Sequence, residues 1–222
     1  MAIQNVSSLF RNISDFMYSN EKNLMKVSFF VVLLTVLFFA HKLWVINREQ
    51  SAQYDFSVLM TEFETVSREK EPQWSTLLDK FESQYKKHSN SSLLPYYLGY
   101  KVQILLAEDK KDEALATIDT IISHLSGSPL ISLYEMERAL IQLDIADEKL
   151  NEAGLESLKK LAQDKDNMHR DSAQYYLGRY YWANDQMVDA RAIWQQLVDE
   201  QRDEKMAPSP WVEQVQQQLA LI

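Results

Sequence analysis

One uninterrupted apolar run occupies residues 27–40, and residues 43–46 extend it beyond Lys42. A helix rises about 1.5 Å per residue, so about 20 residues cross a hydrocarbon core of roughly 30 Å. Lys42 is tolerated near the exit of such a helix because its long stem reaches the headgroups, and Trp44 suits the same interface. The run therefore predicts one transmembrane helix over residues 24–46.

A cleaved signal peptide is the alternative interpretation of this run. Signal peptides carry their apolar segment close to the N-terminus and end in a small-x-small cleavage site. Here 26 residues precede the run, and its end reads Phe39-Ala40-His41-Lys42-Leu43, which is a poor peptidase site. We therefore expect an uncleaved anchor.

The basic residues around the run indicate its orientation. Three precede it and two follow it closely: Arg11, Lys22 and Lys26, then Lys42 and Arg48. Because cytoplasmic flanks carry the excess of Lys and Arg, this bias predicts that residues 1–23 are cytoplasmic. In a Gram-negative cell the protein would then be a single-pass inner-membrane protein, with a periplasmic domain over residues 47–222.

The part beyond the anchor is long enough for one domain with a substantial core. Of the 23 basic and 32 acidic residues, 4 and 2 lie at or before Lys42, which leaves 19 and 30 and a net charge of −11. Such a surface repels phosphate backbones, so we do not expect nucleic acid as a partner. The chain has no cysteine, which excludes disulfides, thiolate metal sites and cysteine nucleophiles.

Apolar residues in this part recur at intervals of three and four, as in Phe56, Leu59 and Phe63. This spacing is typical of amphipathic helices, and only four Gly and five Pro are available for tight turns. The predicted fold class is all-α, with the transmembrane helix followed by a helical stack. The expected helices cover residues 48–69, 73–88, 92–108, 111–125, 129–147, 149–164, 170–184, 186–201 and 209–221.

Alanine pairs seven residues apart occur three times in this stack. The pairs are Ala107 and Ala114, Ala146 and Ala153, and Ala183 and Ala190, with steps of 39 and 37 residues between successive pairs. Each pair spans a polar turn between two expected helices and would put small residues where the helices cross. A period of this length with helix pairs is typical of a solenoid of the tetratricopeptide type.

The last unit resembles a tetratricopeptide repeat most clearly. The positions that match the Leu-Gly, Tyr, Ala and Phe pattern of that repeat are Leu177-Gly178, Tyr181, Ala190 and Trp194. The first unit has three additional residues between Gly99 and Ala114, and the middle unit has Ile141 in place of the glycine. These departures affect the register of individual residues more than the fold.

The whole-chain layout is a short N-terminal segment, one membrane helix and an acidic repeat domain. Three details accompany it: Tyr54-x-Phe56, the Ala-Arg-x-x-Trp stretch from Ala190 to Trp194, and the ending Val-x-x-Gln-Leu-Ala-Leu-Ile. This layout resembles the ancillary SecYEG translocon subunit family, the YfgM-like proteins of Gram-negative inner membranes. The resemblance implies a periplasmic domain that contacts the SecYEG translocon, a membrane-anchored peptidyl-prolyl isomerase-like chaperone and newly secreted client proteins.

Patterns that carry catalysis or cofactors do not occur in the chain. The four histidines have no His companion four residues away, and there is no Gly-rich loop, Gly-x-Ser-x-Gly or Walker pattern. Carboxylate clusters such as residues 108–113 and 199–204 are typical of solvated turns and helix ends. We expect a protein that is not an enzyme, with no catalytic residues, metal, cofactor or small-molecule substrate.

Aromatic residues are frequent in the first helices of the repeats, which line the concave face of a helical-repeat stack. The predicted protein-binding groove consists of Tyr96, Tyr100, Arg138, Gln142, Tyr175, Arg179 and Trp182. Tyr and Arg on an open face suit recognition of extended or partly unfolded segments. The alternative is that these aromatics pack between helices, which must hold for part of them.

Two classes of function remain. The first is an inner-membrane-anchored protein-binding module that assists periplasmic chaperoning of newly secreted proteins. The second is a dedicated assembly scaffold, of the cell-division or cytochrome-maturation type, that binds one specific partner. A binder of many clients should hold unfolded chains, whereas a scaffold should ignore them.

Overall fold

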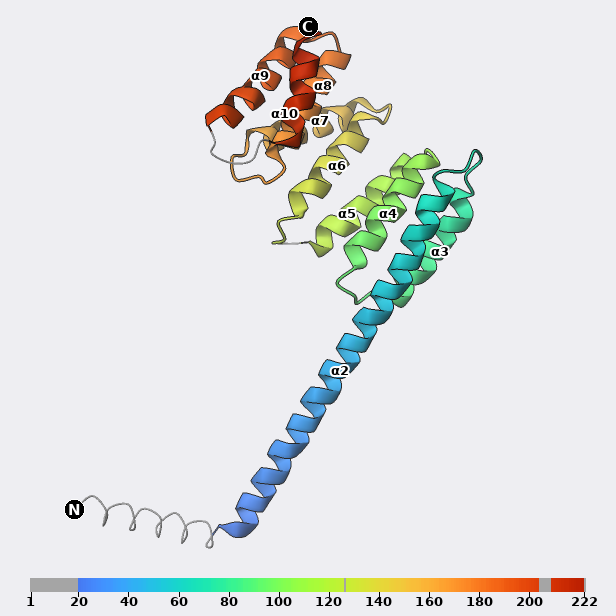
Figure 1. The fold of residues 1–222 in the computed structure, drawn as a ribbon, viewed down its shortest axis with the longest axis vertical. Coiled ribbons are helices and arrows are strands. Elements are labelled where there is room, and N and C mark those ends of the chain that lie inside the picture. The colour runs from blue at the N-terminus through green and yellow to red at the C-terminus, as the bar shows by residue number, and fades with distance from the viewer. Residues whose placement is uncertain (1–19, 126, 204–208, 222) are drawn as a thin grey trace, which may run out of the picture. The chain divides into compact units, whose positions relative to one another are not determined.

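The computed structural model describes residues 20–125, 127–203 and 209–221 (Figure 1). Within these ranges the secondary structure is helical, which confirms the predicted all-α class. Most of the predicted N-terminal segment, residues 1–19, lies outside the described residues. The helices are α2 (Glu21–Val66), α3 (Trp74–Lys87), α4 (Leu94–Ala107), α5 (Lys111–His124), α6 (Ile131–Leu143), α7 (Glu148–Gln163), α8 (Arg170–Ala183), α9 (Met187–Asp203) and α10 (Pro210–Leu219).

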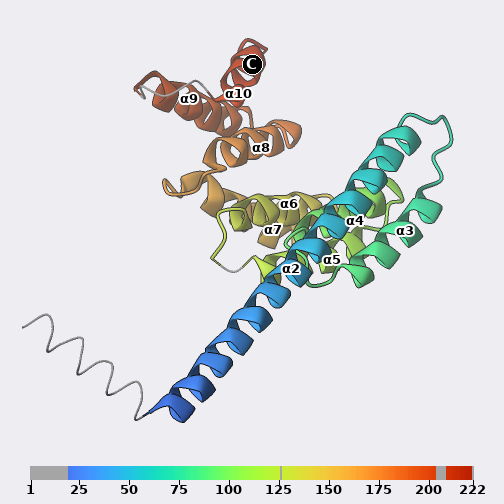
Figure 2. The ribbon, with the colours of Figure 1, turned by 60° about the horizontal axis from the view of Figure 1, so that its bottom comes forward.

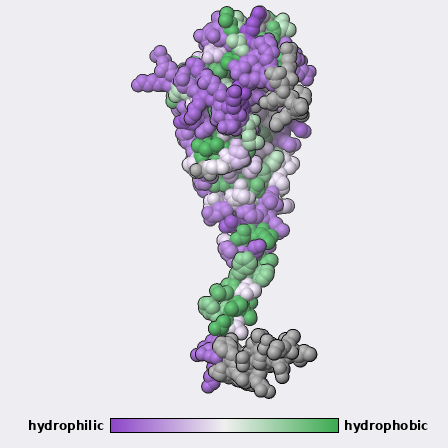
Figure 3. Space-filling model, turned by 90° about the vertical axis from the view of Figure 1, so that its left-hand side faces the viewer, coloured by the Kyte–Doolittle hydropathy of each residue, from purple (hydrophilic) through white to green (hydrophobic). Residues whose placement is uncertain are grey.

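Helix α2 runs without a break from Glu21 to Val66. The sequence pattern predicted two helices here, and that division was wrong because residues 41–53 contain no glycine or proline to end a helix. The apolar stretch of α2 is not buried by other parts of the described chain, and Figure 3 shows hydrophobic residues along it. By length and composition α2 is suited to cross a membrane, and a signal sequence would meet the same criteria.

The chain divides within α2 into two compact units, residues 1–54 and residues 55–222. In the second unit helices pair in chain order, α4 with α5, α6 with α7, and α8 with α9. Each pair packs against the next one along the chain, as Figures 1 and 2 show from two directions. This arrangement is consistent with a helical repeat.

The last turns of α2, from Asp55 onward, run antiparallel to α3 and form ion pairs with it. Lys80 Nζ lies 2.7 Å from Glu62 Oε2, and Lys87 Nζ lies 2.7 Å from Asp55 Oδ2. The buried His88 places its Nε2 2.8 Å from the same oxygen of Asp55. These contacts join residues 55–66 to α3 and to the residue that follows it.

The turns inside the first and third pairs have the same backbone conformation. Asp109 and Asp185 both have φ of 59°, in the left-handed region that Asp tolerates better than most residues. In each turn the next N–H donates to a carbonyl five residues back, Lys110 to Leu105 at 2.8 Å and Gln186 to Tyr181 at 2.9 Å. The turns therefore mark equivalent positions of the repeat.

The turn of the middle pair is one residue longer, which shifts its register. Residues 144–147 separate α6 from α7, whereas three residues separate the helices of the other two pairs. Ala114 and Ala190 are fully buried, as their predicted role at helix crossings requires. Ala153 is exposed, and its neighbour Gly154 lies at the crossing instead. The prediction for Ala153 was therefore wrong by one residue.

The first alanine of each pair does not lie at a crossing. Ala107, Ala146 and Ala183 are exposed, because each falls at the end of a helix or in the turn that follows it. The spacing of seven residues thus marks the turn between two helices. Only the second alanine of the pair lies at a helix contact, and only in the first and third units.

Close approach of α8 and α9 depends on Gly178. A Cβ at this position would lie 2.2 Å from Nε1 of Trp194. Trp194 is fully buried, and its Nε1 donates to the carbonyl oxygen of Tyr175 at 3.1 Å. Two positions that carried the resemblance to a tetratricopeptide repeat therefore form one packing contact.

Helix α10 covers the end of the stack. Val215 is fully buried against α8 and α9, and the ring of Trp211 stacks on Tyr175 with centroids 4.6 Å apart. The outward face of α10 carries the exposed side chains of Glu213 and Gln217. A polar outer face is what the terminal helix of a repeat stack needs to stay in solution.

Candidate functional site

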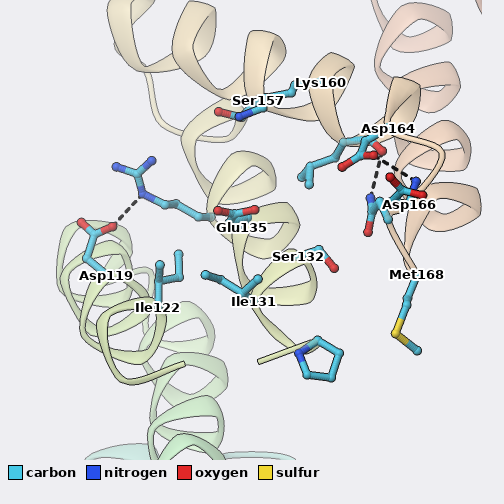
Figure 4. Close-up of a pocket in the computed structure, with 14 residues that line it drawn as sticks. Asp119, Ile122, Ile131, Ser132, Glu135, Ser157, Lys160, Asp164, Asp166 and Met168 are labelled. Carbon is cyan, nitrogen blue, oxygen red and sulfur yellow. Dashed lines mark hydrogen bonds and ion pairs between the residues drawn. The ribbon is translucent and has the colours of Figure 1, made fainter. Parts of the chain in front are cut away.

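A cleft with a volume of about 500 Å³ opens between α5, α6 and α7 (Figure 4). Helices α6 and α7 form one pair, α5 belongs to the preceding pair, and the loop after α7 closes one side. The lining residues are Asp119, Ile122, Pro129, Ile131, Ser132, Glu135, Arg138, Ser157, Lys160, Leu161, Asp164, Asp166, Asn167 and Met168. The cleft therefore lies between two consecutive repeat units.

Side-chain hydrogen bonds order the loop after α7. Asp164 Oδ1 accepts from the backbone N–H of Asp166 at 3.0 Å. Asn167 Nδ2 donates to the carbonyl of Leu161 at 2.9 Å, and its Oδ1 accepts from the N–H of His169 at 2.9 Å. Asx turns of this kind replace the regular helix bonds where the chain reverses. They hold the side chains of this loop at the edge of the cleft.

The connection between α5 and α6 also contributes to the rim of the cleft. It turns at Gly127, whose φ of 77° favours glycine over residues with a side chain. Ser128 follows, and its N–H donates to the carbonyl of Leu125 at 2.7 Å while its Oγ accepts from the N–H of Leu130 at 3.3 Å. This turn brings Pro129 and Ile131 to the cleft wall.

The cleft has an apolar side and a charged side. Figure 4 shows Ile122, Ile131 and Met168 along one edge, and Lys160 with Asp164 along the opposite edge. Met168 is 77% exposed, which is high for a large apolar side chain. Such a surface offers apolar contact and charge to the same ligand.

Arg138, one of the predicted groove residues, lies in this cleft. Its Nε donates to Asp119 Oδ1 at 2.7 Å, which links α6 to α5 across the boundary between units. The side chains are 38% and 56% exposed, so water screens the pair and its contribution to stability is small, about 0–1 kcal/mol. The pair mainly orients the guanidinium.

Two further predicted residues, Tyr96 and Tyr100, lie on α4 against the last turns of α2. Tyr96 is 45% exposed, and its ring centroid is 6.4 Å from that of Phe56. Tyr100 is half-buried, with Phe63 at 5.0 Å and Phe81 at 5.9 Å. Tyr100 therefore belongs mainly to an aromatic core cluster, while Tyr96 keeps an open side.

Gln142 and Tyr175 are buried, so their predicted place on an open face was wrong. Gln142 faces α7, where the close approach of Gly154 covers it. Tyr175 is covered by Trp211 of α10, a helix that the repeat pattern did not place against it. Neither side chain can contact a partner without a rearrangement of the helices around it.

The remaining predicted residues, Arg179 and Trp182, are exposed on α8. The guanidinium of Arg179 lies 5.9 Å from the ring centroid of Tyr175, and the ring of Trp182 lies 6.4 Å from that of Trp194. The seven predicted residues therefore fall in separate places on α4, α6 and α8, and only Arg138 lines the cleft.

Burial perturbs two ionisable groups on α6, Tyr134 and Glu137. Burial, and then the charge of Glu137, raises the pKa of the Tyr134 hydroxyl to about 12. Burial also raises the pKa of the Glu137 carboxyl above its ordinary value. These shifts have the direction expected for packing sites, where the charged forms are poorly solvated.

Sequence reasoning missed most of the cleft because its lining comes from three helices and two loops. The available signal was the segment 164–168, Asp-Lys-Asp-Asn-Met, in which turn-forming residues precede an apolar one. Among the residues that the structure describes, no group of three His, Asp or Glu side chains is arranged to hold a metal ion.

Comparison of the chain with models of protein families gives no match, and comparison with curated proteins gives no significant relative. The structure itself supports an N-terminal long apolar helix followed by eight packed helices in the described part of the chain. The features of this protein on which a function can rest are its long apolar helix, its helical stack and its cleft.

Proposed function

We propose that this protein is a membrane-anchored polypeptide-binding module. Helix α2 would hold it in the membrane, and the cleft between α5, α6 and α7 would receive an extended segment of a partner protein. The observation that carries the proposal is the cleft, about 500 Å³ in volume, with apolar and charged sides on a helical-repeat scaffold. Polypeptide recognition commonly combines an apolar centre with a polar rim in this way.

The resemblance to the ancillary SecYEG translocon subunits supports a more specific form of this proposal. In that form the anchor lies in the bacterial inner membrane and the repeat domain lies in the periplasm. Its partners are the translocon, a membrane-anchored peptidyl-prolyl isomerase-like chaperone and newly secreted clients. The net charge of −11 beyond Lys42 is compatible with a protein-binding role and unfavourable for nucleic acid.

Anchoring raises the occupancy of a cleft that binds its partner weakly. A partner tethered to the same membrane has an effective concentration in the millimolar range, about 1 mM for short flexible links. A partner segment that would mostly dissociate in free solution then occupies the cleft for most of the time. A tethered binder therefore needs no deep pocket and no catalytic step.

Site-specific photo-crosslinking in intact Gram-negative membranes tests the proposal. A photoreactive residue replaces Ser132 in the cleft of the full-length protein, and a matched control replaces Gln217 on the exposed face of α10. We expect covalent adducts with polypeptides from position 132 and few from position 217. Mass spectrometry of the adducts identifies the partners.

The adduct pattern separates the two classes of function. Many secreted proteins at position 132 indicate a chaperone-like binder, and a single recurrent protein indicates a dedicated scaffold. Equal or absent adducts at the two positions would exclude the cleft as a polypeptide-binding site.

The proposed topology predicts the result of a protease experiment. Because Lys and Arg are slightly enriched before the apolar run, protease added outside spheroplasts should digest the C-terminal domain. An immunoblot against the C-terminus should lose the full-length band before the membrane is lysed. Survival of that band until lysis would reverse the topology, and a soluble, shortened protein would show that α2 is a cleaved signal sequence.

A further inference from the structure

Carboxylates outnumber cations in the lining of the cleft. Asp119 is paired with Arg138 at 2.7 Å, which neutralises one carboxylate. Three further carboxylates line the cleft, and one lysine, Lys160, lines it with them. The three are Glu135, Asp164 and Asp166, and all are exposed.

One of these carboxylates is held in place by the loop after α7. Asp164 Oδ1 accepts a hydrogen bond from the backbone N–H of Asp166, which fixes the Asp164 carboxylate at the cleft edge. Lys165 lies between them in the sequence but does not line the cleft. At this edge the cleft lining therefore carries two carboxylates, Asp164 and Asp166, and one cation, Lys160.

Apolar side chains line the cleft together with these carboxylates. Ile122 and Ile131 are half-buried, and Met168 follows the aspartates on the same loop. The long, flexible thioether of Met adapts to apolar groups of different shapes. Aliphatic groups of a ligand can contact these side chains while its charged groups reach the carboxylates (Figure 4).

We infer that the cleft binds a basic, aliphatic polypeptide segment, in which Lys or Arg side chains face Glu135, Asp164 and Asp166 and aliphatic side chains contact Ile122, Ile131 and Met168. This inference rests on the proposed function and specifies its ligand. Charge complementarity at an interface selects partners by repelling segments of like charge. The overall charge of −11 beyond Lys42 reinforces the selection, because it attracts basic segments from a distance.

Fluorescence anisotropy on the full-length protein in nanodiscs tests the inference. The probe is a short fluorescein-labelled peptide with lysines and leucines in a glycine-serine background. Two reference peptides replace its lysines by glutamates or its leucines by serines. We expect the lysine-leucine peptide to bind at least about tenfold more tightly than either reference at low salt, with the difference reduced as salt rises.

A triple variant removes the proposed charges without disturbing the loop. It combines Glu135→Gln, Asp164→Asn and Asp166→Asn, and Asn at position 164 still offers the oxygen that accepts from the N–H of residue 166. We expect a loss of about tenfold in affinity for the lysine-leucine peptide, since each exposed charge pair contributes only modestly. The matched control removes the same charge at exposed positions outside the cleft: Glu69→Gln, Glu71→Gln and Glu152→Gln.

Three results would overturn the inference. The first is equal binding of the lysine-leucine and glutamate-leucine peptides. The second is an equal loss of affinity in the cleft and control variants, which would assign the effect to overall charge. The third is absence of peptide binding. The crosslinking experiment at Ser132 distinguishes these failures from failure of the proposed function, because polypeptide adducts at that position would remain even if the partner segment were not basic.

Discussion

Replacement of Gly178 by alanine should lower the free energy of unfolding by about 2–3 kcal/mol, although alanine is the better helix former by about 1 kcal/mol. The new Cβ would lie 2.2 Å from Nε1 and 2.5 Å from Cε2 of Trp194. The indole is fully buried, and moving it would break its hydrogen bond to the carbonyl of Tyr175. Overpacking therefore outweighs the gain in helix propensity.

The other helical glycines provide matched comparisons for this prediction. Gly154→Ala should also destabilise the protein, because its Cβ would lie 2.7 Å from the backbone oxygen of Ala139. In Gly99→Ala the new Cβ meets only the side chain of Tyr134, whose hydroxyl oxygen is nearest at 3.2 Å, so the free energy of unfolding should stay within about 1 kcal/mol of wild type. All three positions lie inside helices, so differences between them report the steric contacts.

Chemical denaturation of the full-length protein in detergent, followed by circular dichroism, measures these effects. If the free energy of unfolding of Gly178→Ala equals that of wild type, or is no lower than that of Gly99→Ala, then α8 and α9 do not approach as described. A double variant that adds Trp194→Phe should recover part of the loss, because the smaller ring leaves room for the methyl group. Coupling between the two substitutions would confirm direct contact.

Replacement of Val215 by aspartate should cost about 3 kcal/mol or more, because it puts a charge into an apolar contact. Val215 is fully buried in a cluster with Trp194, Leu197 and Val198. A short helix such as α10 can avoid burying the charge by leaving the stack, and the cost is then the lost packing. We expect α10 to detach and expose the faces of Tyr175 and Trp194 that it covers.

Hydrogen exchange of residues 210–219 and the denaturation midpoint measure this effect. The matched control is Gln214→Asp, which introduces the same charge at the adjacent, exposed position. The control should retain slow exchange and a midpoint near that of wild type. Fast exchange in both variants would show that α10 is not held by its apolar face, and slow exchange in Val215→Asp would show that Val215 is not buried.

The positions of the helices followed from local signals in the sequence. Pro95 lies in the first turn of α4, and α10 begins at Pro210, as the fixed backbone angle of proline favours. The largest displacement is at the end of α6, which stops at Leu143 although the pattern extended to residue 147. No local signal ends a helix between the apolar run and Val66, and the expected break there is absent.

The register of the repeat could not be obtained from spacing alone. An additional residue in the turn between α6 and α7 moves the helix crossing from Ala153 to Gly154, and both are small residues that fit the pattern. Similarly, the repeat pattern puts Tyr175 on an open face. In the structure it is covered by Trp211 of α10, which lies 36 positions further along the chain. Burial of this kind depends on which helices meet.

The sequence by itself determined the apolar helix, the all-α class and the approximate helix bounds, because hydrophobic periodicity and turn residues act over a few neighbouring positions. Only the tertiary structure decided which residues of the helices remain accessible and where a cleft forms. The residues that line the cleft extend from Asp119 to Met168 in the sequence and come from three helices and two loops. Packing between repeat units sets that geometry, since each helix buries its apolar face only against its neighbours.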